Sequence, residues 1–189
     1  TGTYYETVVP ANGGTAVDRI TYKANGHVVI DGENIRSRAF DAEGTSLITI
    51  DGFEFTNHPD TGGYDATVHF SDCDFVEVRN CIFHHTGRDA VGLHYGSSDG
   101  LLVNNLFYSI DDDGVTPLGD GNHTLRSNTL YGCGGWAIEA AATSGNLYEN
   151  NIIWDQIDNI GGSVTYAYNN YVSGILPGTR NILSDPLFL

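Results

Sequence analysis

Asn128-Thr-Leu-Tyr is one of five short phrases in which an asparagine opens a segment rich in β-forming residues. The other four are Asn80-Cys-Ile-Phe, Asn105-Leu-Phe-Tyr, Asn151-Ile-Ile-Trp and Asn170-Tyr-Val. Successive asparagines are separated by 25, 23, 23 and 19 residues, and two phrases with glycine in the first position, Gly32-Glu-Asn-Ile and Gly52-Phe-Glu-Phe, precede them. A period of this length is typical of stacked repeats. Residues one repeat apart are then expected about 4.8 Å from one another, the spacing of neighbouring strands.

The residues before these positions alternate between apolar and polar side chains. Apolar pairs stand four and two residues before the anchor, as Ile48 and Ile50, Val76 and Val78, and Leu101 and Val103. Alternation with a period of two predicts strands with one buried face. Arg126 and Glu149 fall at the second of these positions in later repeats, which predicts a bulge or a register shift there.

Stacked repeats of this length favour one architecture over three others. Propeller blades need about 40 residues, and leucine-rich repeats need a leucine consensus that is absent. A sandwich does not place one polar residue at the same corner in five consecutive turns. The sequence therefore predicts an all-β parallel β-helix of about seven coils, and no segment has a helical stripe of apolar residues.

The recurring asparagines are predicted to be structural. A sharp corner between two strands suits residues that tolerate a left-handed backbone, such as glycine and asparagine. Stacked asparagine side chains also form hydrogen bonds to the copies above and below. We therefore expect an asparagine ladder.

Composition limits the classes of function. The 189 residues suit one domain, residues 1–189, which is expected to be trimmed at one or both ends because Thr1 is not a native start. The formal charge of −16 disfavours nucleic acid, and it also disfavours a bare polyanion unless divalent cations bridge the two. Three cysteines predict no disulfide framework, and no apolar run approaches the roughly 20 residues of a membrane span. Exposed strand edges at the solenoid ends would allow homo-oligomers.

Several phrases resemble a known superfamily. Gly2-Thr-Tyr-Tyr-Glu, Ile20-Thr-Tyr-Lys-Ala, Val28-Val-Ile-Asp-Gly and Ser184-Asp-Pro-Leu-Phe, together with the asparagine series, are similar to the right-handed parallel β-helix proteins typified by pectate lyases. The resemblance covers nearly the whole chain and implies a secreted bacterial protein. It also implies a polysaccharide or oligosaccharide partner, although the superfamily holds lyases, hydrolases, epimerases, phage spikes and adhesins. In these proteins the strand before the first turn forms the floor of the substrate groove.

Counting 11 residues back from successive anchors places Asp41, His69 and His94 in one column, where their apolar neighbours face inward. The next repeats place Pro117 and Ala140 there, with Glu139 one position away. An imidazole beside a carboxylate is a reasonable general base. We therefore expect His69 or His94 as the base, unless both are surface histidines on a solvated sheet.

A second column lies in the loops before these strands. Asp65, Asp89 and Asp113 are separated by 24 and 24 residues, and Asp111 and Asp112 add further charge. Stacked carboxylates repel, so that either a pKa rises or a cation neutralises them. Their oxygens suit Ca²⁺, which predicts Asp89, Asp111 and Asp113 as ligands. The alternative is that each aspartate caps its own turn.

Other side chains near these columns complete the predicted site. Arg88 is expected to stabilise negative charge on the substrate, or else to pair with Asp89; Asp89, Asp112 and Asp113 are expected to act as acids or metal ligands. The predicted substrate contacts are Asp41, His85, Tyr95, Tyr108 and Glu139, and Tyr64 and Trp136 are further aromatic candidates.

Two classes of function stay open at this point. Arg88-Asp89-Ala-Val and Asp112-Asp113-Gly-Val resemble two phrases of the polygalacturonase type, but Gly132-Cys-Gly-Gly stands where its histidine belongs. The first class is an enzyme of the lyase, hydrolase or epimerase type that cleaves or modifies a polysaccharide. The second is a non-catalytic β-helix that binds glycan or displays a surface as part of an adhesin, a spike or a larger enzyme.

Overall fold

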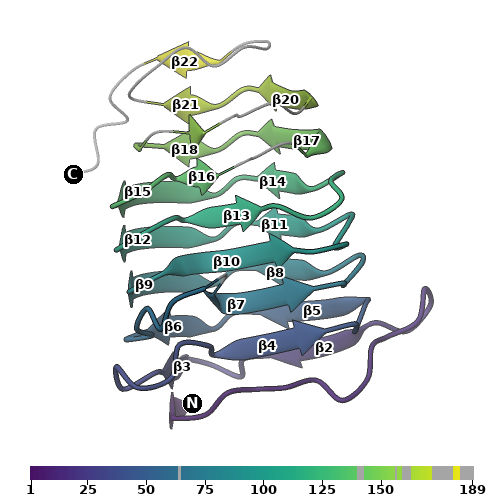
Figure 1. The fold of residues 1–189 in the computed structure, drawn as a ribbon, viewed down its shortest axis with the longest axis vertical. Coiled ribbons are helices and arrows are strands. Elements are labelled where there is room, and N and C mark those ends of the chain that lie inside the picture. Colours follow the sequence, from purple (N-terminus) through teal and green to yellow (C-terminus); the bar gives the residue numbers. More distant parts are fainter. Residues whose placement is uncertain (64, 140–142, 156, 159–162, 172–180, 184–189) are drawn as a thin grey trace.

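The fold is a parallel β-solenoid built from three sheets. The computed structural model describes residues 1–63, 65–139, 143–155, 157–158, 163–171 and 181–183. These residues form strands without any helix, and every strand pairs in parallel with a strand of the neighbouring coil (Figure 1). The predicted all-β, right-handed β-helix is confirmed, with about six turns. Tyr64, Ala140 and the phrase that begins at Ser184 lie outside the described residues.

Successive coils contribute parallel strands to three sheets, here called A, B and C. Sheet A contains β1 (Gly2–Tyr4), β3 (Val28–Asp31), β6 (Glu54–Thr56), β9 (Ile82–Thr86), β12 (Leu106–Ile110), β15 (Thr129–Cys133), β18 (Ile152–Ile153), β21 (Asn170–Tyr171) and β22 (Ile182–Leu183). Sheet B contains β4 (Phe40–Glu43), β7 (Ala66–Ser71), β10 (Asp89–His94), β13 (Val115–Pro117), β16 (Ile138–Glu139) and β19 (Ile157–Asp158). Sheet C contains β2 (Ile20–Lys23), β5 (Ile48–Asp51), β8 (Glu77–Arg79), β11 (Leu101–Val103), β14 (Thr124–Arg126), β17 (Ser144–Glu149) and β20 (Ser163–Ala167).

The interior is filled by columns of similar apolar side chains. Phe55, Phe83 and Phe107 lie in register on sheet A, and successive rings stack with centroids 4.9 Å and 4.9 Å apart. Because alternate residues of a strand face one side, the period of two sends these rings inward. Each fully buried ring contributes roughly 1.5–3 kcal/mol of hydrophobic stabilisation.

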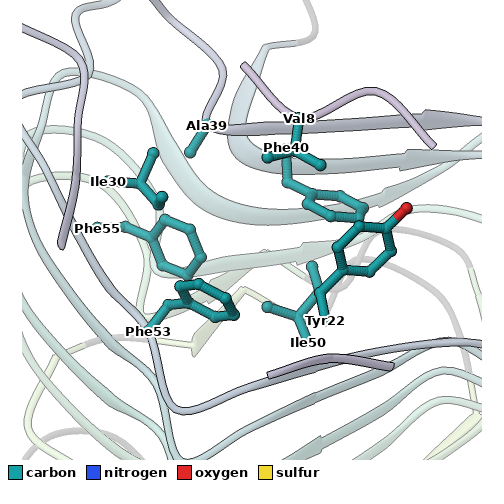
Figure 2. Close-up of a pocket in the computed structure, with 8 residues that line it drawn as sticks. All are labelled: Val8, Tyr22, Ile30, Ala39, Phe40, Ile50, Phe53 and Phe55. Atoms are coloured by element: carbon teal, nitrogen blue, oxygen red, sulfur yellow. The ribbon is translucent and has the colours of Figure 1, made fainter. Parts of the chain in front are cut away.

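The N-terminal end of this interior is hollow. The hollow is lined by apolar side chains from all three sheets and from the segment before β2 (Figure 2), namely Val8, Tyr22, Ile30, Ala39, Phe40, Ile50, Phe53 and Phe55. Tyr22 meets Phe40 edge to face, with ring centroids 5.0 Å apart. The side chains that line the hollow therefore continue the apolar core of the later coils.

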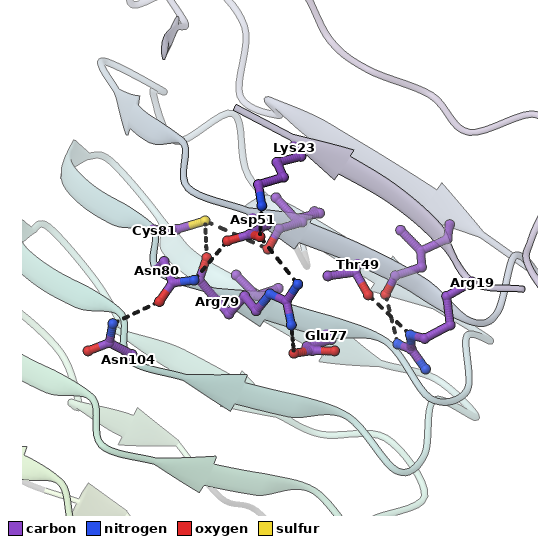
Figure 3. A network of polar contacts seen from close by, with 12 residues as sticks. Arg19, Lys23, Thr49, Asp51, Glu77, Arg79, Asn80, Cys81 and Asn104 are labelled. Carbon is purple, nitrogen blue, oxygen red and sulfur yellow. Dashed lines mark hydrogen bonds and ion pairs between the residues drawn. The ribbon is translucent and has the colours of Figure 1, made fainter. Parts of the chain in front are cut away.

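The corner between sheets C and A consists of two columns where one was expected. The left-handed backbone falls on one column, which contains Gly52, Asn80, Asn104, Ser127, Asn150 and Tyr168. The next residue along the chain begins a buried column with Cys81, Asn105, Asn128, Asn151 and Asn169. In the first column, Asn104 donates to Asn80, which donates to Asp51 (Figure 3).

The buried asparagines bond to one another from coil to coil. The Asn128 side-chain oxygen accepts from both the backbone and the side-chain nitrogen of Asn105, each at 3.0 Å. Asn151 does the same for Asn128, at 2.9 Å and 3.1 Å. The predicted anchors Asn80 and Asn170 lie one residue away from this buried column, because sequence spacing alone did not separate two adjacent polar columns.

The separation of the corner into two adjacent columns also accounts for Arg126 and Glu149, which had suggested an irregularity in the later repeats. Val103, Arg126 and Glu149 are aligned with one another on the outer side of sheet C. Their neighbours Leu102, Leu125 and Tyr148 fill the interior. The bulge predicted from Arg126 and Glu149 is therefore absent at these residues, and the register instead shifts between Ser144 and Asn146.

Candidate functional site

The outer side of sheet B carries polar side chains that do not repeat from coil to coil. Asp41 on β4 is aligned with His69 on β7, as the sequence predicts. The next residues in this register are Gly92 on β10 and Thr116 on β13, and not His94 and Pro117. Four coils thus present four different residues, whereas the interior columns present similar ones.

His94 reaches this column from two residues further along its strand. Its imidazole covers Gly92, because a Cβ atom on that glycine would lie 2.6 Å from His94 Cε1 and 2.7 Å from Nε2. The His94 and His69 rings meet at an angle of 64° with centroids 5.2 Å apart. A glycine therefore supplies the slot into which the histidine side chain folds back. The two imidazoles are neighbours, as expected, although the expected register is wrong.

Thr116 links His94 to Asp89. The Thr116 hydroxyl lies 2.9 Å from His94 Nε2 and donates to Asp89 Oδ2 at 3.0 Å. Ala90 and Val91 both belong to the core, so the alternation of β10 is interrupted and Asp89 faces the same side as Gly92. All three linked residues are buried, with 0% of Thr116, 2% of His94 and 4% of Asp89 exposed.

Arg38 closes the other end of the row. Its Nη1 lies 2.7 Å from Asp41 Oδ1, and its Nε lies 2.6 Å from Asp65 Oδ1. Asp41 Oδ1 also lies 3.1 Å from His69 Nδ1. Asp65 was expected to stack on Asp89, but Asp89 is aligned with Ala66, and Asp65 instead binds Arg38.

Asp89, Asp112 and Asp113 form a carboxylate cluster beyond Thr116. One oxygen of each lies within 4.8 Å of the others. Arg88 Nε lies 3.3 Å from Asp112 Oδ2 and 3.7 Å from Asp89 Oδ1, which makes the ion pair that was considered as an alternative role for Arg88. Asp111 does not join this group. The cluster therefore contains Asp112 in the place predicted for Asp111.

Burial sets the protonation states along the row. Desolvation, followed by the negative charge of Asp113, raises the pKa of Asp89 to about 7. Desolvation together with the charges of Asp112 and Glu139 raises the pKa of Asp113. Desolvation and then the proximity of His69 lower the pKa of His94 to about 4, and desolvation also lowers the pKa of His69. Near neutral pH the row therefore holds the uncharged imidazoles of His69 and His94 and the partly protonated carboxyl group of Asp89.

Among the residues that the structure describes, two groups of three side chains could hold a cation. They are Asp89, Asp112 and Asp113, and Asp41, Glu43 and His69. Carboxylate oxygens are ligands that Ca²⁺ prefers. An arginine already lies against each group, however: Arg88 against the first and Arg38 against the second. A bound cation would have to displace that guanidinium.

The remaining predicted contacts are divided between two faces. Glu139 lies on β16 beside Asp113, and the Tyr95 ring, 59% exposed, lies 6.3 Å from that of His94. His85 and Tyr108 belong to sheet A, where Tyr108 stacks on His84. These two residues are therefore not part of the row on sheet B.

Three residues of the row were not predicted, namely Arg38, Gly92 and Thr116. Counting 11 residues back from the left-handed corner residue Asn104, instead of from Asn105, gives the core residue Leu93, one residue from Gly92. Arg38 could have been noted as one of only eight basic residues in the chain.

The chain belongs to the right-handed β-helix family. The model of this family, described as a right handed beta helix region, matches residues 12–172. No curated protein sequence matches the chain. Among the described residues, no helix is long and apolar enough to cross a membrane.

Three solved structures are similar to the chain in fold. An alginate lyase from Paenibacillus sp. str. FPU-7 aligns with a TM-score of 0.75 at 16% identity, over 90% of this chain and 66% of its own. PfbA, a surface adhesin of Streptococcus pneumoniae, aligns with 0.62 at 14%, over 88% and 50%. A GH136 lacto-N-biosidase from Eubacterium ramulus aligns with 0.57 at 14%, over 88% and 42%. The chain thus spans between 42% and 66% of these proteins, and the likeness extends to the fold alone.

Proposed function

We propose that the chain hydrolyses glycosidic bonds in a glycan that lies along the outer side of sheet B. The observation that carries this proposal is the cluster of Asp89, Asp112 and Asp113, in which a carboxyl group with a pKa of about 7 lies beside an accessible carboxylate. Glycosidases cleave with two carboxyl groups, of which one holds a proton and the other is ionised. Similarity in fold to an alginate lyase and a lacto-N-biosidase supports a glycan as the partner.

Accessibility suggests a role for each carboxyl group. The Asp112 side chain is 39% exposed and can reach a sugar, whereas Asp89 and Asp113 lie beneath it. Burial and the charge of Asp113 raise the pKa of Asp89, so Asp89 is the group that holds the donated proton. One oxygen of each carboxyl group lies within 4.8 Å of the others, so the three groups are close enough to act on one glycosidic bond.

Lyase chemistry fits the row less well. A lyase must stabilise an enolate-like charge on a uronic acid, which requires a positive group that is free to bind it. Arg38 is held by Asp41 and Asp65, and Arg88 lies against Asp89 and Asp112. Lys23, the single lysine of the sequence, lies on sheet C and pairs with Asp51 (Figure 3).

A non-catalytic glycan-binding module is the second candidate. Only 3% of His69, 2% of His94 and 4% of Asp89 are exposed, so a sugar cannot contact these groups without a rearrangement of the face. The similarity in fold to a surface adhesin supports the same reading. In that case the buried row would only shape the surface above it.

The experiment is incubation of the protein with neutral and uronic-acid polysaccharides, followed by assays for new reducing ends and for ultraviolet absorbance of unsaturated products. We expect reducing ends without unsaturation, and we expect Asp112→Asn and Asp89→Asn to abolish them. Asp120→Asn, at an exposed aspartate between β13 and β14, is the matched control and should keep full activity. Unsaturated products would instead establish a lyase, and no product from any polysaccharide would favour the binding module.

Calcium at the carboxylate cluster is a separate proposal. Its oxygens are suitable ligands, and the positive charge of Arg88 would be exchanged for that of the ion. Arg88→Ala should therefore strengthen a rise in melting temperature on addition of CaCl₂. If neither the natural protein nor this variant shifts with CaCl₂, calcium does not bind to the cluster.

A further inference from the structure

We infer that His84 and His85 bind a divalent transition-metal ion, of the group that contains nickel, copper and zinc, on the outer side of sheet A. The two ligand atoms are the Nδ1 nitrogens of these neighbouring imidazoles, and Glu54 holds the His84 ring in place. The site lies on a different sheet from the polar row. It therefore goes beyond the proposed glycan hydrolysis and does not depend on it.

The backbone at His85 brings the two rings together. Successive residues of a strand normally face opposite sides of the sheet. His85, which follows His84 in β9, has a left-handed backbone with a φ of 52°, and this interrupts the alternation. The two rings meet at an angle of 87° with centroids 5.0 Å apart, and their Nδ1 atoms lie 2.7 Å from one another. Two nitrogen ligands thus face the same point.

The His84 ring is held in one orientation. Tyr108 stacks on it, with centroids 4.9 Å apart and an angle of 12° between the planes. Its Nε2 lies 3.1 Å from Glu54 Oε1, and only 14% of the His84 side chain is exposed. A glutamate near neutral pH is ionised and can only accept hydrogen bonds. The ring hydrogen of His84 is therefore on Nε2, and Nδ1 presents a lone pair toward His85.

Two hydrogen-bond donors share that lone pair in the metal-free chain. They are the His85 Nδ1 group, at 2.7 Å, and the Thr56 hydroxyl, whose oxygen lies 3.2 Å from His84 Nδ1. A bound ion replaces both hydrogens, and the ring hydrogen of the exposed His85 moves from Nδ1 to Nε2. Two nitrogens that each lie about 2.0–2.1 Å from one ion are roughly 3 Å apart. The rings therefore need only a small separation to admit it.

Glu54 supports His84 in the way that carboxylates support metal-binding histidines. Such a histidine usually donates its second ring hydrogen to a carboxylate, which fixes the ring and strengthens it as a ligand. The other Glu54 oxygen lies 2.7 Å from His27 Nε2. Within the described part of the chain, Glu54 forms ion pairs with these two histidines and with no arginine or lysine. An ion here displaces no guanidinium, unlike an ion at either group on sheet B.

The ligand atoms determine which ions fit. Imidazole nitrogens suit nickel, copper and zinc, whereas Ca²⁺ takes oxygen ligands. The formal charge of −16 adds a general attraction for cations. Because His85 is exposed, water can occupy the remaining positions around the ion.

The experiment is a titration of the intact, EDTA-treated protein with ZnCl₂ at about pH 7.5, where unperturbed imidazoles are mostly uncharged. Calorimetry measures the affinity, and the ¹⁵N chemical shifts of the histidine rings locate the ion. We expect the Nδ1 shifts of His84 and His85 to change. Those of His58 and His123, which are bonded to backbone groups elsewhere, should stay constant. CaCl₂ should leave the shifts of His84 and His85 unchanged.

A variant at His85 and a matched control test the ligands. Asn57 occupies the same corner one coil earlier with a φ of 57°, so His85→Asn suits the backbone. It should weaken zinc binding by at least about 100-fold, since loss of a ligand exceeds the roughly 10–100-fold effect of a supporting group. His27→Gln removes a histidine from the same surface but no ligand, and it should leave the affinity unchanged.

Glu54 is tested as a positioning residue by two substitutions. Glu54→Ala should weaken zinc binding by roughly 10–100-fold. Glu54→Gln keeps an acceptor for the His84 ring and should restore most of the affinity. Equal affinities in these two variants would contradict the positioning role of Glu54.

The inference is overturned if ZnCl₂ does not change the Nδ1 shifts of His84 and His85 in the folded natural chain. It is also overturned if His85→Asn, shown to be folded by circular dichroism, binds zinc as tightly as the natural chain. A change confined to His69 would place the ion at the group of Asp41, Glu43 and His69, and would reject the site on sheet A.

Discussion

The buried asparagine column and the polar row on sheet B are both stacks of polar residues, yet they are built on opposite principles. Asn105, Asn128 and Asn151 repeat one residue, and each amide satisfies the backbone and side chain of its neighbour. The row changes residue in every coil, as in Asp41 and His69, and it buries the ionisable side chains of His69, Asp89 and His94. In a solenoid, repetition therefore indicates architecture, and its interruption indicates a site.

Energetics give this comparison its meaning. A neutral amide that keeps all its hydrogen bonds is buried at little cost, whereas a buried carboxylate or imidazolium resists ionisation. That resistance is seen in the raised pKa of Asp89 and the lowered pKa of His94. Perturbed groups of this kind concentrate at functional sites, although structural networks also produce them. The asparagine column stabilises the fold, whereas ionisation of Asp89 or His94 in the row costs stability.

The largest effect is expected from the asparagine column. Asn128→Ala removes one acceptor of two bonds from Asn105 and one donor to the Leu102 carbonyl, and leaves these buried partners unsatisfied. We expect a loss of roughly 3–5 kcal/mol in the free energy of unfolding, measured with urea. Asn104→Gly, in the exposed left-handed column, keeps the positive φ and should cost less than about 1 kcal/mol. Equal losses in the two variants would show that the buried column contributes no more to stability than the exposed column.

A slightly smaller loss is expected where the row meets Arg38. Arg38→Met leaves the buried Asp65 without its cation, which should cost about 3 kcal/mol near pH 7. The natural pKa of Asp65 is lowered, so its contribution is present above about pH 4 and is lost as the pH falls. The variant should therefore resemble the natural protein more closely at low pH. Arg126→Met, which breaks the exposed pair with Glu149, is the control and should change stability by less than about 1 kcal/mol.

The third prediction concerns Asp89 in the row, where a substitution should raise the free energy of unfolding and not lower it. The pKa of Asp89 is raised to about 7, so the native state holds a proton that the unfolded chain releases, and stability falls as the pH rises from about 4 through 7. Asp89→Asn removes that cost. We expect it to be more stable than the natural protein by roughly 1–3 kcal/mol at pH 8, with little difference at pH 4. Urea unfolding at both pH values measures this, and a loss of stability at pH 8 would contradict it.

The smallest effect concerns a third stack, on the outer side of sheet A. The rings of His84, Tyr108 and Tyr131 lie nearly parallel, with centroids 4.9 Å and 5.6 Å apart. Tyr108→Leu should cost about 1 kcal/mol, the value of ring stacking beyond simple burial. It should leave glycan cleavage unchanged, because Tyr108 lies on a different sheet from the row. A variant with reduced cleavage would restore the predicted role of Tyr108 in substrate binding.

The sequence predicted the fold well because strand period and repeat period are both local signals. It also predicted that Asp41 and His69 are neighbours, since both belong to regular strands counted from correct corners. His94 was placed in the wrong register for two reasons: the corner residue is Asn104 and not Asn105, and 12 residues separate Gly92 from that corner where 11 separate His69 from Asn80. Arg38 and Thr116 were not identified, because their importance depends on contacts with residues between 22 and 27 positions away.

By itself, the sequence determined that this chain is a parallel β-helix of stacked coils with a net negative charge. Alternation and repetition specify which residues face inward, and backbone hydrogen bonds join the strands of neighbouring coils. The tertiary structure alone decided that the His94 ring folds over Gly92, that Thr116 lies between His94 and Asp89, and that Arg38 binds two carboxylates. These contacts depend on the exact register of neighbouring coils and on side-chain direction, and a shift of one residue would separate them.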